Sequence, residues 1–133
     1  MVRIIVLVAA MLLVPLASKA QGSDIEAVIS AQIEAFKQDD FAGAFEYASP
    51  AIRDIFRNPE NFGNMVRQGY PMVWRPGEVA YGDLREIAGR LWQRVQIADA
   101  KGVVHLLDYQ MIEHENGWKI NAVQLLDSAV PNV

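Results

Sequence analysis

The sequence predicts an α+β domain in which a group of helices precedes a four-stranded antiparallel meander. In the first half of the chain, apolar residues recur at helical spacing between capping residues and prolines. From Glu78 onward the apolar spacing changes to two, and three turn signals divide this half into strands at approximately 78–87, 90–98, 103–114 and 118–127. One face of the sheet is apolar, so we expect that face to pack on the helices around a single core.

The first twenty residues are typical of a cleavable signal peptide. Arg3 gives a positive start, residues 4–17 form an uncharged apolar run, and Ser18-Lys19-Ala20 carries small residues where a signal peptidase cleaves. The run is shorter than the roughly 20 apolar residues that cross a bilayer, and Pro15 interrupts it. We therefore expect cleavage after Ala20, a mature domain at 21–133, a periplasmic or secreted location, and no membrane attachment after cleavage.

Composition and charge exclude several classes of function. The chain has 12 Lys and Arg residues, 16 Asp and Glu residues and no Cys. Removal of Arg3 and Lys19 with the leader leaves ten basic and sixteen acidic residues, a net charge of −6, which disfavours nucleic-acid binding. Without cysteine there is no disulfide and no thiolate nucleophile. The two histidines lack the spacing of a metal site, and we expect neither a metal nor another cofactor.

Helix start and stop signals divide the first half into four helices. The first begins with a capping box formed by Ser23 and Glu26. Three shorter helices begin at Asp39 or Asp40, at Ser49-Pro50 and at Asn58-Pro59. Pro71, Pro76 and Gly77 then end helix formation, which predicts an extended connector over 70–75. The residues expected to face the core from these helices are Ile25, Val28, Ile29, Ile33, Phe36, Phe41, Ala44, Phe45, Ile52, Ile55, Phe56, Phe62, Met65 and Val66.

Two turns predict the register of the last three strands. A type I′ turn at Asn116-Gly117 places Tyr109 opposite Gln124. A three-residue loop ending at Gly102 places Asp99 opposite Val103 and, further along, Gln93 beside Tyr109 and Arg94 beside Asp108. The turn at Ala88-Gly89 leaves the first strand open: either Ala80, Gly82 and Leu84, or Val79, Tyr81, Asp83 and Ile87, face the core.

The order of helices and meander, ending in Gly117-Trp118-Lys119-Ile120, resembles the cone-shaped superfamily of nuclear transport factor 2, ketosteroid isomerase and scytalone dehydratase. Within it, roughly residues 24–127 are similar to a group of short exported bacterial proteins known as a domain of unknown function. The matching motifs are Gln32-x3-Phe36, Ala48-Ser49-Pro50, Met65-Val66, Gln93-x-Val95, Tyr109 and Gly117-Trp118-Lys119-Ile120. The resemblance implies the cone-shaped fold and carries no assigned chemistry.

A row of polar residues on the predicted core face is the candidate site. Gln93, Tyr109 and Gln124 fall opposite one another on three adjacent strands, and Gln32 lies within the apolar stripe of the first helix. Such groups either satisfy one another or line a ligand pocket with apolar walls. His105 lies at the far end of the same face, where a histidine can act as a base or metal ligand or simply be a hydrogen-bonded rim residue. The predicted ligand-binding set is therefore Gln32, Gln93, Tyr109, Gln124 and His105.

Three functions fit these features. The first is a non-catalytic exported domain that binds a small, largely apolar molecule in the cone. The second resembles the isomerases and dehydratases of the superfamily, with Asp83 as base and Tyr109 as donor to a developing oxyanion, and it requires Asp83 on the core face. The third is a homodimer through the outer face of the sheet, which carries Trp92, Val104, Leu106, Ile112, Val123 and Leu125.

Overall fold

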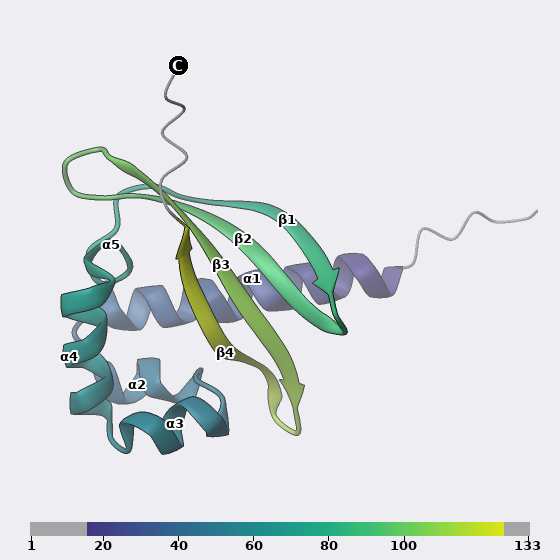
Figure 1. Ribbon diagram of the computed structural model, residues 1–133, viewed down its shortest axis with the longest axis horizontal. Coiled ribbons are helices and arrows are strands. Elements are labelled where there is room, and N and C mark those ends of the chain that lie inside the picture. Colours follow the sequence, from purple (N-terminus) through teal and green to yellow (C-terminus); the bar gives the residue numbers. More distant parts are fainter. Residues whose placement is uncertain (1–15, 127–133) are drawn as a thin grey trace, which may run out of the picture.

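A computed structural model describes residues 16–126 and shows the predicted α+β class: helices followed by a four-stranded antiparallel sheet in the order β1-β2-β3-β4. The long helix α1 runs across one face of the curved sheet, and the short helices gather near one end of it (Figure 1). The elements are α1 (Leu16–Lys37), α2 (Phe41–Glu46), α3 (Pro50–Phe56), α4 (Pro59–Gly69), α5 (Pro71–Trp74), β1 (Val79–Ile87), β2 (Arg90–Ala98), β3 (Val104–His114) and β4 (Gly117–Leu126).

The caps of the three short helices are those that the sequence predicts. The side chains of Asp40, Ser49 and Asn58 each accept a hydrogen bond from a backbone N–H in the first turn of α2, α3 and α4. Two predictions are wrong. Ser23 does not begin α1, which starts at Leu16, because the intervening Ala, Lys and Gln residues favour helix. Residues Pro71–Trp74 form the helical turn α5, because proline is compatible with the first turn of a helix.

The β2–β3 register agrees with the prediction, whereas the β3–β4 register does not. Gln93 pairs with Tyr109 and Arg94 with Asp108. The predicted type I′ turn at Asn116-Gly117 needs a positive φ at both residues, but in the hairpin of β3 and β4 only Gly117 has one, 107°. The central residues of the turn are instead Glu115-Asn116, and His114 pairs with Gly117. An irregularity opposite Gln110 and Met111 then adds a residue to β4, and Val123 instead of Gln124 lies opposite Tyr109.

A bulge in β1 combines the two alternatives that the sequence leaves open. Val79 and Tyr81 pair with Ile97 and Val95 on the core face, and the register then shifts between Tyr81 and Leu84. Beyond the shift, Leu84 pairs with Gln93, so that Leu84 lies on the core side. Asp83 falls inside the irregular segment and is exposed.

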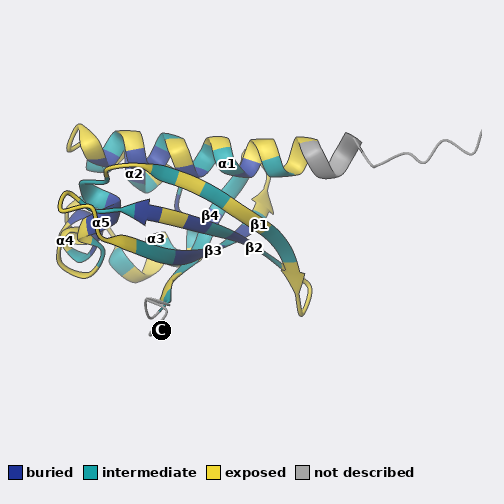
Figure 2. Cartoon of the chain, turned by 90° about the horizontal axis from the view of Figure 1, so that it is seen from above, coloured by how far each residue is buried: buried dark blue, intermediate teal, exposed yellow. Residues whose placement is uncertain are grey.

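The core lies between α1 and the sheet. Buried residues form one stripe along α1 and face buried residues of β2 and β3 (Figure 2). The outer edge of β4 is covered by the segment between α2 and α3: the Ile120 N–H donates to the Tyr47 carbonyl at 2.8 Å, and the Ser49 N–H donates to the Ile120 carbonyl at 2.8 Å. These two bonds fix α3 beside β4, which places the helix for the cavity described below.

Candidate functional site

A cavity of about 270 Å³, partly open to solvent, lies between the helices and the end of the sheet. The helices and strands around it are α1, α3, α4, α5, β3 and β4, of which α3, α4 and β4 lie at the lower left and centre of Figure 1. Fourteen residues line the cavity: Gln32, Phe36, Ala48, Ile52, Phe56, Phe62, Met65, Val66, Tyr70, Val73, Tyr109, Ile120, Ala122 and Val123.

The depth of burial of the lining residues shows where the cavity opens. The residues from α1 and β3 that line it are buried. By contrast, Ile52 and Phe56 on α3, Met65 on α4 and Val123 on β4 are only partly buried. The cavity therefore has its base against α1 and β3 and its mouth between α3, α4 and the edge strand β4.

The wall is apolar except for three polar side chains. The Gln32 amide nitrogen donates to the Ala44 carbonyl at 3.1 Å, and the Tyr70 hydroxyl donates to the Val123 carbonyl at 3.1 Å. The third polar group is the hydroxyl of Tyr109, which is fully buried. Among the side chains of residues 20–126 it is the one buried nitrogen or oxygen atom with no hydrogen-bond partner.

The environment of Tyr109 keeps its phenol protonated. Burial raises the pKa of this phenol well above its ordinary value because the phenolate would lose its hydration, and the Tyr81 and Tyr70 phenols raise it further. At neutral pH the group is therefore an O–H that can donate or accept a hydrogen bond.

The chain has a known family. A family model described as "Domain of unknown function (DUF4864)" matches residues 18–133. The chain belongs to this family. Among solved structures, it is similar to the phospholipid-binding protein from Ralstonia solanacearum in complex with a phospholipid, at 14% sequence identity and a TM-score of 0.49, over 80% of this chain and 78% of that one. No curated protein matches the chain.

The structure brings two of the five predicted site residues of this DUF4864 domain to the cavity, Gln32 and Tyr109. Gln93 is buried but does not line the cavity, and its amide nitrogen donates to the carbonyls of Gly82 at 2.8 Å and Arg94 at 3.0 Å. Those carbonyls flank the β1 bulge. Gln93 therefore donates hydrogen bonds to backbone carbonyls where the pairing of β1 and β2 is irregular. This role depends on the bulge, which the sequence does not reveal.

The other two predicted residues lie away from the cavity. Gln124 is exposed and pairs with Asp108 instead of Tyr109, because the extra residue in β4 turns it to the other face. His105 is partly buried at the end of the sheet, with its Nε2 atom 2.9 Å from Oδ2 of Asp99. The hydrogen bond from His105 is the largest influence that lowers the pKa of the Asp99 carboxyl, with the N–H groups of Val103 and Lys101 adding to it.

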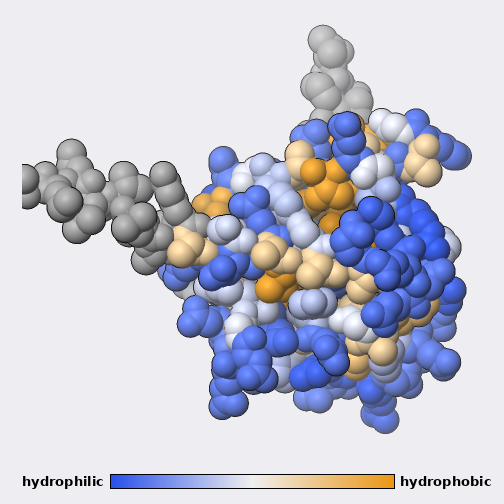
Figure 3. Space-filling model, turned by 180° about the vertical axis from the view of Figure 1, so that it is seen from behind, coloured by the Kyte–Doolittle hydropathy of each residue, from blue (hydrophilic) through white to orange (hydrophobic). Residues whose placement is uncertain are grey.

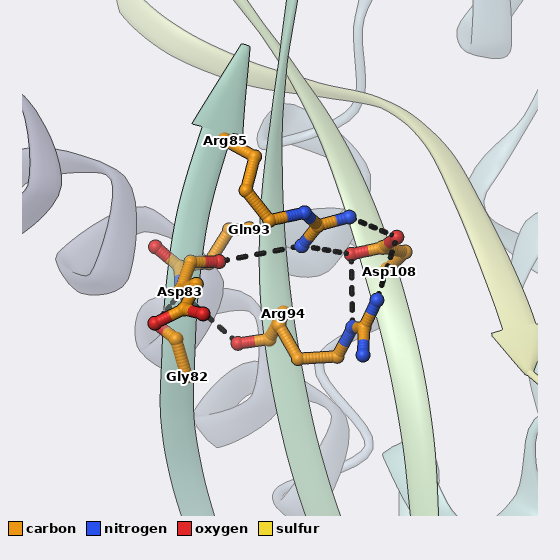
Figure 4. A network of polar contacts seen from close by, with 6 residues as sticks. All are labelled: Gly82, Asp83, Arg85, Gln93, Arg94 and Asp108. Carbon is orange, nitrogen blue, oxygen red and sulfur yellow. Dashed lines mark hydrogen bonds and ion pairs between the residues drawn. The ribbon is translucent and has the colours of Figure 1, made fainter. Parts of the chain in front are cut away.

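Asp83 does not meet the condition of the enzymatic alternative. It is exposed in the β1 bulge, and its carbonyl accepts a hydrogen bond from Arg85 at 3.4 Å (Figure 4). Tyr109 is fully buried on the core face. The prediction that Asp83 is a base and Tyr109 a hydrogen-bond donor in one catalytic site is therefore wrong, because both groups would have to reach the same substrate.

An ion-pair network occupies the outer face of the sheet instead. Asp108 accepts two hydrogen bonds from Arg85, at 3.0 and 2.6 Å, and two longer ones from Arg94, at 3.3 and 3.4 Å (Figure 4). Burial alone would raise the pKa of Asp108, but the hydrogen bonds from Arg85 and Arg94 outweigh it and the pKa lies below its ordinary value. This is the opposite-charge pair of Arg94 and Asp108 that the sequence predicts, strengthened by Arg85.

The sequence does not predict that apolar residues of α3 and α4 line a cavity, because their helical spacing is the same as that of core residues. Ile52 and Phe56 do face inward from α3, but Ile55 is 67% exposed. A signal was present in two small residues, Ala48 and Ala122, which lie in the wall where larger side chains would fill the space.

Two further kinds of feature are absent from residues 16–126, a metal-binding cluster and a membrane-spanning helix. No three His, Asp or Glu side chains converge there as metal ligands would. No helix in that range is both long and apolar enough to cross a membrane, and the predicted leader lies largely outside it. Seen from behind, the described part of the molecule is mostly hydrophilic, with apolar residues in small separate areas (Figure 3).

Proposed function

We propose that this chain is a non-catalytic domain that binds a small, largely apolar molecule in the cavity between α1, α3, α4 and β4. One observation carries the proposal: a partly open cavity of about 270 Å³ whose lining residues, all within 16–126, include no Lys, Arg, His, Asp or Glu. A well-packed interior leaves few voids larger than a water molecule. A concave apolar site with a few polar groups is the usual form of a small-molecule site.

The volume limits the ligand. Small-molecule sites generally run from about 300 to 1,000 Å³, so this cavity lies at the small end. At the ~30 Å³ that one water occupies in the liquid, it has room for about nine water-sized groups. A short aliphatic or monocyclic molecule fits this space, as does one end of a longer molecule that extends through the mouth.

The test compares two isoleucines on the same helix. The neutral fluorescent probe N-phenyl-1-naphthylamine, whose phenyl ring can enter the cavity while its naphthyl group extends through the mouth, is titrated into the parent protein, Ile52→Trp and Ile55→Trp. Ile52 lines the cavity, whereas Ile55 points away and is 67% exposed. We expect saturable binding to the parent and to Ile55→Trp, and at least tenfold weaker binding to Ile52→Trp because the indole occupies the cavity. Equal binding to all three proteins would place the probe elsewhere and contradict the proposal.

We further propose that the chain is exported, with cleavage after Ala20, and that the domain adopts the cone-shaped fold of the nuclear transport factor 2 superfamily. The leader motif Ser18-Lys19-Ala20 supports export, and the order of helices and meander supports the fold. The intact mass of the protein from the medium or periplasm tests the cleavage site: a mass that begins at Gln21 is expected.

A homodimer through the outer sheet face is a second proposal. Val104 is 44% exposed there, and Trp92, Leu106 and Ile112 are partly exposed on a face opposite α1. Two of the predicted residues do not contribute: Val123 lines the cavity, and Leu125 pairs with Leu107 on the core side. Light scattering at tens of micromolar should give a dimer mass for the parent and a monomer mass for Leu106→Asp. A monomeric parent would contradict this proposal.

A further inference from the structure

The hydroxyl of Tyr109 indicates which kind of molecule the cavity takes. Tyr109 lines the cavity, is fully buried, and has the one unpartnered buried polar atom among the side chains of residues 20–126. A buried hydroxyl without a hydrogen bond is unfavourable, and each such case in a native protein calls for a physical reason. Phenylalanine would fill the same position without this cost, so the hydroxyl contributes nothing visible to packing.

The other polar groups of the wall already have hydrogen-bond partners. One N–H of the Gln32 amide donates to the Ala44 carbonyl, and the Tyr70 hydroxyl donates to the Val123 carbonyl. Tyr109 is therefore the lining residue with a hydroxyl proton free to donate. A ligand that offers an acceptor atom at the base of the cavity would satisfy it.

The charge of the wall limits the ligand in a second way. The lining residues within 16–126 carry no cationic or anionic side chain. An ionised carboxylate or amine placed in the cavity would lose its hydration without gaining a counter-ion. The part of the ligand that enters must therefore be neutral.

We propose, on the basis of the binding function above, that the ligand is a neutral, mainly aliphatic molecule whose single hydrogen-bond acceptor, such as a ketone or ester carbonyl oxygen, is bound by the hydroxyl of Tyr109. The apolar side chains from α3 and α4 contact its hydrocarbon part. Tyr109 thus distinguishes an oxygen-bearing molecule from a plain hydrocarbon of the same size.

The experiment measures displacement of N-phenyl-1-naphthylamine by 2-octanone and by octane, from the parent, Tyr109→Phe and Tyr70→Phe. Tyr70 is the matched control because it also lines the cavity and its hydroxyl already has a partner. Tyr109→Phe should weaken binding of 2-octanone about tenfold, the size of one hydrogen bond to a buried donor, and leave the binding of octane unchanged. Tyr70→Phe should change the ratio of the two affinities by less than twofold.

Two additional readouts separate ligand recognition from a structural role. The midpoint of thermal unfolding of ligand-free Tyr109→Phe should equal or exceed that of the parent, because an unpartnered hydroxyl is removed, whereas Tyr70→Phe should unfold at a lower temperature. Octanoate at pH 7 should displace the probe at least tenfold more weakly than 2-octanone.

The outcomes distinguish this inference from the binding function on which it rests. Loss of probe binding in every protein, the parent included, would overturn the binding function itself. Normal probe binding with equal weakening of 2-octanone and octane in Tyr109→Phe would overturn the role of Tyr109 alone. A lower unfolding midpoint for Tyr109→Phe would show that the hydroxyl stabilises the fold, and octanoate binding as tight as that of 2-octanone would overturn the requirement for a neutral ligand.

Discussion

At the residue scale, the buried side chains of Gln93 and Tyr109 have different roles even though both belong to the same predicted polar row. The amide nitrogen of Gln93 donates to two backbone carbonyls at the β1 bulge, whereas the hydroxyl of Tyr109, with which Gln93 pairs, has no partner. Hydrogen bonding therefore separates a structural polar group from a candidate ligand-binding group. Burial alone does not, because both side chains are almost completely buried.

The structural role of Gln93 gives a stability prediction. Gln93→Leu removes two hydrogen bonds to the carbonyls of Gly82 and Arg94, and it should lower the free energy of unfolding by about 1–3 kcal/mol. Gln124→Leu is the control: Gln124 is exposed, and the change should be within about 0.5 kcal/mol. Urea denaturation of both variants measures this. If Gln93→Leu were as stable as the parent, the bulge would not depend on the glutamine.

At the scale of an element, the first hairpin carries a local strain that can be relieved. Ala88 takes a φ of 51° in the turn between β1 and β2, followed by Gly89 at 77°. A left-handed conformation costs a non-glycine residue about 1–2 kcal/mol, and Asn-Gly or Gly-Gly is preferred in such a turn.

Ala88→Asn and Ala88→Gly should therefore raise the free energy of unfolding by roughly 0.5–1 kcal/mol. For Ala88→Gly this figure allows for the greater conformational freedom of glycine in the unfolded chain, which offsets part of the gain. The matched control is Ala100→Gly in the next hairpin, where the positive φ belongs to Gly102 and not to Ala100. That change should be neutral or destabilising. The midpoint of thermal unfolding is measured for the three variants. A lower midpoint for Ala88→Asn than for the parent would contradict the left-handed conformation of residue 88.

At the scale of the whole molecule, ion pairs make stability depend on pH. The pKa of Asp108 is lowered in the folded protein because hydrogen bonds from Arg85 and Arg94 outweigh the effect of burial. Hydrogen bonds from Trp74 and then Arg75 lower the pKa of Asp39 in the same direction. A lowered folded pKa contributes stability that is fully present above the unfolded value of about 3.9, and this contribution is lost as the pH falls through the folded pKa.

We therefore expect the free energy of unfolding to fall as the pH is lowered below about 5. Asp108→Asn should destabilise the protein at pH 7 by about 1–3 kcal/mol, because two partly buried arginines lose their partner, and should flatten the acid limb of the stability curve. Asp83→Asn, in the exposed bulge, should leave the curve unchanged. Urea titrations from pH 3 to 7 test this, and an unchanged slope in Asp108→Asn would assign the acid sensitivity to other carboxyl groups.

The α+β class, the caps of α2, α3 and α4, and the register of β2 against β3 could all be predicted from the sequence. Each depends on local chemistry. The spacing of apolar residues indicates the class, capping side chains indicate the helix starts, and a glycine at a fixed place in the turn sets the register. The apolar pattern also predicted that Tyr109 and Gln32 face the core, and both are buried. Only the tertiary structure decided the β1 bulge and the extra residue of β4, because an inserted residue leaves the alternation on either side intact while exchanging the two faces. For the same reason Gln124 and Asp83 do not line the cavity. The cavity wall formed by α3 and α4 depends on the distance between those helices and β4, which the spacing of apolar residues in the sequence does not predict.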